Sequence, residues 1–372
     1  MKILVLNWQD IKNPLAGGAE VHLHEVFGRI AKMGHEVTLF CSSFDGAPRE
    51  EEIDGIHVIR QGSRPLFNYL VPQKYFSTFK RQKFDLVVDD MNKIPFYTPL
   101  YVREPLLGVT HHLFGTSIFL EASFPAASYV YLAEQAALPV YKSLRFIVGS
   151  PSTHKEMLHA GFPADRTHLI PYGVAHESFR QLDVPKSATP LVGMVGRLKK
   201  YKSADHLLEA FVAVRQELPA ARLVIIGDGD DKPRLVSIAG NLGISGSVTF
   251  EGFVSEEEKV RRLNEMHVAV NTSAKEGWGL TVIEANACGT PTVSSNVEGL
   301  RDAVVEGETG LLYEYGNREQ LAEKILLLLR DERLRRRLGD NALKRSREFD
   351  WNIAAEQTME VIEKVRAEHR AR

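Results

Sequence analysis

Two cations and two carboxylates in the second half of the chain have the types and the spacing to hold a diphosphate and the groups attached to it. Arg197 and Lys202 lie in GRLKKYK, directly after an apolar run. Two fixed cations can offset the charge that develops on a leaving diphosphate without a metal ion. Glu276 and Glu284 follow further on. A carboxylate facing a diphosphate is repelled by about 4 kcal/mol per close charge pair, so we expect Glu276 to accept hydrogen bonds from a sugar and Glu284 from a ribose.

Each of these assignments has a plainer alternative. GRLKKYK can be a solvated basic loop, and Glu284 can be an exposed helix residue. The apolar residues around Glu284 argue against that second alternative, because an uncompensated charge is costly there. Gly277 and Gly279 precede a helix that we expect to start near Leu280, and a helix N-terminus favours phosphate.

Two glycine-containing turns in the same half follow predicted strands. In GDGDDKPRL, Asp228 and Asp230 match the DxD pattern of metal-dependent sugar transfer. The glycines favour a tight turn instead, with Asp230 or Asp231 capping the next helix. Asp228 stays a candidate for contact with a nucleotide. In TFEGFVS, the backbone at Phe253 is placed to meet a nucleobase.

In the first half, the loop NPLAGGAEVH contains Gly17 and Gly18 just before a predicted helix. Glycines there let the backbone approach a phosphate, although a simple helix cap is the alternative. Glu20 and His22, on the first turn of that helix, are expected to face the ligand.

Two pairs of titratable residues also follow strands in the first half. His111 and His112 come after one apolar run, so at least one is expected at the carboxyl edge of the sheet, where ligands bind. Asp89 and Asp90 end another run and can orient an acceptor hydroxyl or cap the next helix.

The elements that must position these residues alternate as strand and helix, which predicts an α/β fold with parallel sheets. We expect two doubly wound, Rossmann-like domains, residues 1–182 and 190–350, facing across a cleft that holds the ligand. LDVPKSATP, residues 182–190, reads as the linker, and a last helix of about 351–372 is expected to pack back onto the first domain. Apolar runs predict strands at 3–6, 36–40, 86–88, 107–109 and 146–148 in the first domain, and at 191–195, 222–226, 248–250, 267–270, 292–293 and 310–312 in the second.

Composition limits the other possibilities. The 372 residues carry a formal net charge of −2, which gives no general attraction to nucleic acid. The two cysteines, Cys41 and Cys288, are far apart, so we expect neither a disulfide framework nor a zinc site, and a reducing cytoplasm. We expect no signal peptide and no membrane-spanning segment.

Taken in order, GGAE, GRL with its following lysine, GDG, EGF, the two glutamates with seven residues between them, and FDW make the chain similar to glycosyltransferase family 4. That resemblance implies the GT-B fold and a retaining mechanism. It also implies that the enzyme uses UDP- or GDP-sugars and needs no metal ion or other cofactor. It also implies that Arg197 and Lys202 bind the diphosphate, Glu276 the donor sugar and Glu284 the ribose. The family has a histidine at the catalytic centre, and its spacing favours His112 over His111.

The resemblance implies transfer of a hexose to an acceptor hydroxyl in polysaccharide, glycolipid or other glycoconjugate synthesis. The acceptor is a sugar, a lipid-linked molecule or a small molecule. A sugar-nucleotide epimerase and a non-catalytic nucleotide-sugar binding protein are the rival hypotheses. A nicotinamide dehydrogenase is disfavoured, because no G-x-G-x-x-G follows the first strand.

Two segments of the first half are rich in aromatic residues. KYFSTFKRQKF, residues 74–84, also contains four cations, and can rest on an anionic membrane surface at the inner face of the membrane. Its alternative is an amphipathic helix whose aromatic side chains fill the core. The stretch 114–141 can line an apolar acceptor pocket.

Overall fold

The computed structural model describes residues 1–91, 94–120 and 122–371, which divide into two compact units. The first unit comprises Met1–Gly173 and Trp351–Arg372, and the second comprises Val174–Asp350. The final residue of the predicted last helix, Arg372, lies outside the described residues. Each unit is built around one sheet, and each is described here by itself.

The sheet of the first unit has the strand order β3-β4-β2-β1-β5-β6-β7-β8. All neighbouring strands are parallel except β3, which pairs antiparallel with β4 at the edge. The strands are β1 (Lys2–Leu6), β2 (Glu36–Cys41), β3 (Glu50–Ile53), β4 (Ile56–Arg60), β5 (Leu86–Met91), β6 (Leu106–Thr110), β7 (Arg145–Val148) and β8 (Thr167–Leu169).

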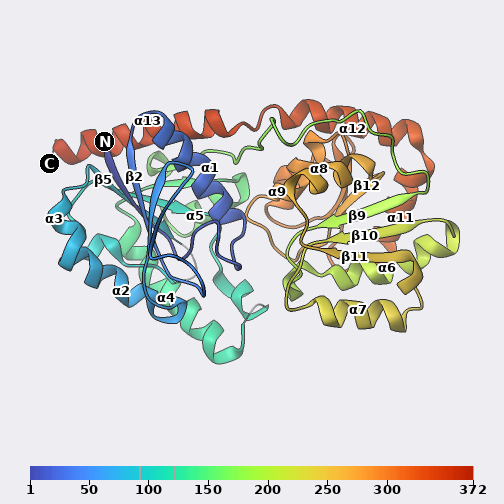
Figure 1. Cartoon of the computed structure of the whole chain (residues 1–372), viewed down its shortest axis with the longest axis horizontal. Helices are drawn as coiled ribbons and strands as arrows, with labels where there is room; N and C mark the ends of the chain where they lie inside the picture. Colours follow the sequence, from blue (N-terminus) through green and yellow to red (C-terminus); the bar gives the residue numbers. More distant parts are fainter. Residues whose placement is uncertain (92–93, 121, 372) are drawn as a thin grey trace. The chain divides into compact units, whose positions relative to one another are not determined.

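Helices cover this sheet, and one of them comes from the far end of the sequence. Helix α13 (Trp351–Arg370) packs along α1 (Gly18–Lys32), as Figure 1 shows, and Arg29 Nε donates to Asn352 Oδ1 at 3.0 Å. The other helical elements are η1 (Arg64–Leu66), α2 (Phe67–Lys74), the π-helix η2 (Tyr75–Phe79), α3 (Lys80–Gln82), η3 (Thr98–Leu100), η4 (Gly115–Leu120), α4 (Phe124–Tyr141), α5 (Pro151–His159) and η5 (Ala164–Arg166).

The sheet of the second unit is parallel throughout, with the order β11-β10-β9-β12-β13-β14. Helices lie on both of its faces (Figure 1). Its strands are β9 (Leu191–Val195), β10 (Arg222–Ile226), β11 (Val248–Gly252), β12 (Val268–Asn271), β13 (Thr292–Ser295) and β14 (Gly310–Tyr313). Its helical elements are η6 (Lys200–Lys202), α6 (Ala204–Glu217), α7 (Lys232–Asn241), η7 (Ser245–Ser247), α8 (Glu256–Glu265), α9 (Leu280–Ala287), α10 (Leu300–Ala303), α11 (Arg318–Arg330) and α12 (Glu332–Ser346).

In both sheets the strand order reverses direction between two central neighbours. These neighbours are β1 and β5 in the first unit, and β9 and β12 in the second. Parallel sheets of this doubly wound kind bind ligands outside the carboxyl ends of the strands at such a reversal. A ligand is therefore expected beside the residues that follow β9 and β12, or beside those that end β1 and β5.

Most predicted strands match the observed ones to within a few residues, because their apolar runs are buried on both faces.

The segment 182–190 was predicted to be a linker with few contacts. In the structure it is instead hydrogen-bonded to the body of the second unit. Lys186 Nζ donates to the Met266 carbonyl at 2.6 Å and to Thr290 Oγ1 at 2.8 Å. Leu182 N also donates to Asn264 Oδ1 at 2.9 Å.

Candidate active site

The loops that follow β9 and β12 are tied to each other at the carboxyl edge of the second sheet. Thr272 Oγ1 donates to the Lys202 carbonyl at 2.8 Å, and Ala274 N donates to the Tyr201 carbonyl at 2.8 Å. These bonds fix the turn that carries Lys202 against the segment that carries Glu276. The topology thus brings together two predicted residues that are far apart in sequence.

Lys202 Nζ forms an ion pair with Glu276 Oε1 in this setting. The same Glu276 oxygen accepts from Ser273 Oγ at 2.7 Å, and Ser273 is itself held by Asn271 Oδ1. Burial alone would lower the pKa of Lys202, but the Glu276 carboxylate outweighs it and the pKa is raised. The ammonium therefore stays charged at neutral pH, beside a carboxylate that is held from two sides.

Arg197 is the second predicted cation and follows β9 by two residues. It is half-buried, and its charge acts to lower the pKa of Lys202. The two cations therefore interact electrostatically at one edge of the sheet. Like charges held close together repel each other, and a dianion that binds both is favoured.

The GDG turn after β10 supports the loop that carries Arg197. A Cβ on Gly227 would lie 2.0 Å from the Gly196 carbonyl oxygen, and Gly227 has φ +129°. A Cβ on Gly229 would lie 2.1 Å from the Leu198 carbonyl oxygen. These glycines are required because one backbone packs directly on another.

The three aspartates of that turn have structural partners. Asp228 Oδ2 accepts from Lys232 Nζ at 2.9 Å and its Oδ1 from Gly229 N at 2.8 Å, so the lysine holds the pKa of Asp228 below its usual range. Asp231 is the N-cap residue of α7, but its side chain does not cap the helix. The prediction of a capping carboxylate is wrong, because Asp231 instead binds Arg234 at 2.6 Å, while Asp230 pairs with Lys199.

Gly277, Gly279 and Leu280 lead into α9 as predicted. Gly279 is the N-cap residue with φ +90°, a conformation that favours glycine. The preceding backbone is packed closely as well, since a Cβ on Gly299 would lie 2.2 Å from the Glu276 carbonyl oxygen. The segment from Glu276 to the start of α9 thus packs closely against the backbone at Gly299.

Glu284 lies in the middle of α9, and its side chain is only 15% exposed. Its Oε1 accepts from Lys259 Nζ of α8 at 3.0 Å. Among the described residues, Glu284 Oε2 is buried without a hydrogen-bond partner. The alternative of an ordinary exposed helix residue is therefore wrong.

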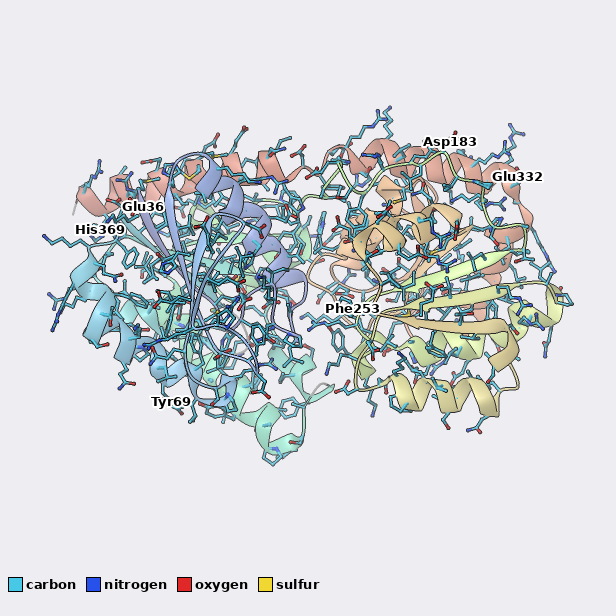
Figure 2. All side chains as sticks on the ribbon, viewed as in Figure 1. Glu36, Tyr69, Asp183, Phe253, Glu332 and His369 are labelled. Atoms are coloured by element: carbon cyan, nitrogen blue, oxygen red, sulfur yellow. The ribbon has the colours of Figure 1, made fainter. Side chains whose placement is uncertain are left out.

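Phe253 follows β11 and projects from the second unit with 87% of its surface exposed (Figure 2). The carbonyl of the preceding Gly252 accepts from Gly227 N at 2.8 Å. Contact between this backbone and a nucleobase stays a prediction.

In the first unit, the amide of Gly17 is already bonded. Gly17 N donates to Glu20 Oε2 at 2.6 Å, and Gly17, with φ −148°, is the N-cap residue of α1, which starts at Gly18. The structure thus shows the simple helix cap that the sequence left open. Glu20 is buried, and burial raises the pKa of its carboxyl.

His111 follows β6 and is held at both ring nitrogens. Nε2 lies 2.9 Å from Asp90 Oδ1, and Nδ1 is bonded to the Tyr172 hydroxyl. Burial alone would lower the pKa of His111, but the Asp90 carboxylate raises it above the ordinary value. His111 is thus a buried, paired imidazole.

The other two candidate histidines have different surroundings. His112 is half-buried, with its ring centroid 4.4 Å from that of Phe114. His22 is buried against the rings of Tyr172, His111 and Trp351, and neither nitrogen has a hydrogen-bond partner among the described residues. Burial, together with the neighbouring His111, lowers the pKa of His22 well below its ordinary value, so the ring is neutral.

Asp89 and Asp90 lie within β5, so neither caps a helix and that alternative is wrong. Asp89 Oδ2 accepts from Thr98 Oγ1 at 2.5 Å and from the Tyr141 hydroxyl at 2.6 Å. Complete burial raises the pKa of Asp89 to about 6 despite these two donors.

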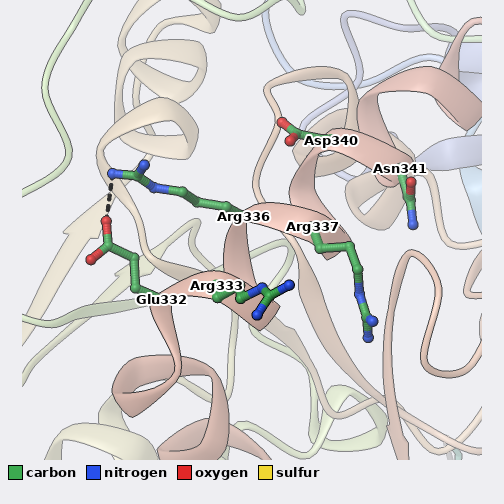
Figure 3. A pocket seen from close by; sticks show the side chains of 6 residues that line it. All are labelled: Glu332, Arg333, Arg336, Arg337, Asp340 and Asn341. Atoms are coloured by element: carbon green, nitrogen blue, oxygen red, sulfur yellow. Dashed lines mark ion pairs between the residues drawn. The ribbon is translucent and has the colours of Figure 1, made fainter.

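A surface depression on α12 has no relation to these residues. Its lining side chains all come from that one helix (Figure 3), and include the Glu332–Arg336 ion pair of 2.5 Å. The lining residues are Glu332, Arg333, Arg336, Arg337, Asp340 and Asn341. None of them was a candidate from the sequence, and we assign this depression no role in the chemistry.

Two family models match consecutive parts of the chain. The family described as Glycosyltransferase Family 4 matches residues 16–178, and the family described as Glycosyl transferases group 1 matches residues 176–345. The chain is a family 4 glycosyltransferase. The glycosyltransferase matches therefore extend over both units, including the carboxyl edges described above.

Curated relatives of this glycosyltransferase match it over different shares of its length. An uncharacterized glycosyltransferase of Methanocaldococcus jannaschii is 23% identical, over 98% of this chain and 99% of its own. A D-inositol 3-phosphate glycosyltransferase of Streptomyces bingchenggensis is 31% identical, over 58% of this chain and 52% of its own. The alignment thus spans about half the length of that second relative.

Solved structures show the fold of this glycosyltransferase over nearly the whole chain. A sucrose-phosphate synthase from Thermosynechococcus elongatus has a TM-score of 0.82 at 23% identity, over 98% of this chain and 99% of its own. HepE of Anabaena, in complex with UDP-glucose, has a TM-score of 0.76 at 20% identity, over 98% of this chain and 100% of its own. These likenesses show that the two units have the GT-B fold.

Four residues of the candidate site were missed by the sequence reasoning. Asn271 and Ser273 support Glu276, Lys259 pairs with Glu284, and Tyr172 holds His111. The first two had a usable signal, because they end or follow a strand at its carboxyl edge. The other two contacts join segments that no local pattern connects.

Proposed function

We propose that the chain transfers a hexose from a UDP- or GDP-sugar to an acceptor hydroxyl with retention of configuration, and without a metal ion. The observation that carries this proposal is the Lys202–Glu276 ion pair beside Arg197 at the reversal point of the second sheet. A cation pair suits the diphosphate, and a carboxylate held from two sides suits sugar hydroxyls. HepE, which has the same fold, is described in complex with UDP-glucose.

In this proposal the second unit binds the donor. Arg197, Lys202 and the amides at the start of α9 stabilise the leaving diphosphate. Glu276 accepts from hydroxyls of the transferred sugar, and Glu284 accepts from the ribose through Oε2, which has no partner among the described residues. When the donor binds, the diphosphate takes over Lys202 as a partner, and the Glu276 carboxylate turns to the sugar.

The first unit binds the acceptor, which is a glycan or a lipid-linked glycoconjugate. Its segment 61–84 contains no acidic residue and five cations, and it exposes Leu66, Tyr69 (Figure 2) and Phe76. The hydroxyls of Tyr69 and Tyr129 lie 3.2 Å apart and join this segment to α4, which exposes further apolar side chains. Apolar side chains among cations suit the interface of an anionic membrane, where a lipid-linked acceptor would be presented. None of the described helices is long and apolar enough to cross a bilayer.

The test begins with the donor. UDP, GDP and their hexose conjugates are screened by thermal shift, because a ligand that binds only the native state raises the melting temperature. The best donor is then incubated with candidate acceptors, and the products are analysed by mass spectrometry and by NMR of the anomeric centre. Glycosylated acceptor with the donor's anomeric configuration supports the proposal.

Three outcomes would contradict it. A product that keeps its nucleotide, with an altered sugar, would indicate an epimerase. Binding of a nucleotide sugar with neither transfer nor hydrolysis would indicate a binding protein, and transfer with inverted configuration would overturn retention. Transfer that is abolished by EDTA and restored by a divalent cation would overturn the proposal of metal independence.

A further inference from the structure

Lys259 of α8 contacts Glu284 of α9, and this contact joins two helices at the predicted ribose end of the donor site. Its Nζ lies 3.0 Å from Glu284 Oε1, and the two side chains are 23% and 15% exposed. The other basic residues of α8 are engaged nearby, since Arg261 and Arg262 pair with Glu258 and Glu265. Lys259 is thus the α8 cation that the structure shows bound to α9.

The ammonium group of Lys259 is fixed on a second side by an aromatic ring. Nζ lies 4.5 Å from the ring centroid of Phe179, a side chain that is only 4% exposed. A cation over a buried ring is attracted by the negative face of the ring, and its rotamer freedom is restricted. Lys259 therefore presents its charge to Glu284 from a defined position.

The two oxygens of Glu284 differ as a result. Oε1 is bonded to Lys259, whereas Oε2 is buried and has no hydrogen-bond partner among residues 1–91, 94–120 and 122–371. A buried acceptor without a partner is costly, so its presence indicates a group that arrives from outside. A hydroxyl of a bound molecule would supply the missing donor.

We propose that Lys259 is a positioning residue, which neutralises Glu284 and orients it so that Oε2 accepts from a ribose hydroxyl. This inference rests on the proposed function, because it takes the ligand to be a nucleoside diphosphate. Lys259 contacts the carboxylate and not the ligand. Lys259 therefore determines how strongly the site prefers a nucleotide with ribose hydroxyls over one without them. It leaves the other contacts of the nucleotide unchanged.

The test compares a nucleotide with and without its ribose hydroxyls. Calorimetry with UDP and GDP identifies the tighter ligand for the unmodified protein, and the 2′,3′-dideoxy form of that nucleotide is then measured. We expect the dideoxy form to bind about tenfold more weakly, equivalent to about 1.4 kcal/mol. In Lys259→Met the dissociation constant of the normal nucleotide should rise about tenfold, and that of the dideoxy form should stay unchanged. The variant should therefore bind the two forms equally and lose its preference for the ribose hydroxyls.

Lys324→Met is the matched control. Lys324 is also in the second unit, is 27% exposed and pairs with Glu306 at 3.3 Å, so its loss removes a similar ion pair elsewhere. This variant should keep the preference for the ribose hydroxyls. Lys259→Arg should retain most of the preference, because it keeps the charge, and Lys259→Gln gives the same readout if the methionine variant does not fold.

The outcomes separate this inference from the proposed function. An unmodified protein that binds neither UDP nor GDP overturns the proposed function, and the inference with it. Binding with a ribose preference that persists in Lys259→Met overturns the inference alone. An equal loss of affinity for both forms in Lys259→Met also overturns it, because a merely structural role would weaken binding without changing discrimination.

Discussion

Lys202 and Glu276, 74 residues apart in the sequence, form an ion pair at the carboxyl edge of the second sheet. Each is the proposed partner of a different part of the donor. The two side chains therefore satisfy each other's charge, and in the proposed mechanism the donor replaces this one internal contact with two contacts of its own. Residues in such a pair are coupled, and substitution of either one changes the state of the other.

Lys202→Met should reduce transfer by at least a hundredfold, because it removes a cation from the developing diphosphate charge. It should also lower the melting temperature, since it leaves the half-buried Glu276 without its ammonium. Steady-state kinetics and thermal unfolding measure the two effects. Lys200→Met is the control, because Lys200 is exposed in the same short helix, and both quantities should stay at their normal values. Normal turnover in Lys202→Met would contradict the assignment.

His111 and His112 should respond differently to replacement by alanine. His111→Ala leaves Asp90 buried without its cation, and should cost about 3 kcal/mol in the free energy of unfolding. His112→Ala should leave that free energy nearly unchanged, because the ring is only half-buried, and should lower turnover if His112 is the histidine that contacts the ligand. Urea denaturation and transfer kinetics together make the distinction. Loss of turnover in a fully stable His111→Ala variant would reverse the two roles.

Asp89 should make the protein less stable as the pH rises from about 4 to about 6. Its pKa is raised to about 6 in the folded chain from an ordinary 3.8, so the native state binds more protons than the unfolded state across that interval. Stability then falls by about 3 kcal/mol in total from this group. Asp89→Asn should remove this slope from the unfolding free energy measured against pH. Asp45→Asn serves as the control, because Asp45 is exposed and lies in a turn. An unchanged slope in Asp89→Asn would contradict the assignment.

Gly227→Ala should impair both folding and transfer. The new Cβ would lie 2.0 Å from the Gly196 carbonyl oxygen, and φ +129° is strained for any side chain. We expect a loss of more than about 2 kcal/mol in stability, and displacement of the loop that carries Arg197. Gly246→Ala is matched to it, because a Cβ there meets nothing within 4 Å and the substitution should be nearly neutral. Circular dichroism melts measure both, and equal melting temperatures would count against the close packing.

The sequence predicted the two doubly wound sheets because buried parallel strands are short apolar runs, such as Leu191–Val195, that local composition reveals. It also predicted the residues at the strand ends, since their position follows from the topology. The short strand β3 (Glu50–Ile53) was missed, because three consecutive glutamates hide an edge strand that is largely open to solvent.

The pairing of side chains could not be predicted in the same way. No local pattern shows that Lys259 reaches Glu284, or that Tyr172 and Asp90 hold His111. Such contacts depend on the rotation of helices and loops that are set by tertiary packing. The adjacent histidines illustrate this limit, because a shift of one residue exchanges the buried ring of His111 for the half-buried ring of His112.

Helix α13 completes the first unit, although the whole second unit separates it from α1 in the chain. During synthesis the ribosome releases α1 early and α13 last. The face of α1 that packs on α13 therefore stays uncovered while residues 174–350 are synthesised, and those residues form one unbroken segment that makes up the second compact unit. The first unit can therefore be completed only after the second has been synthesised, and a chain truncated before residue 351 would lack the helix that covers α1.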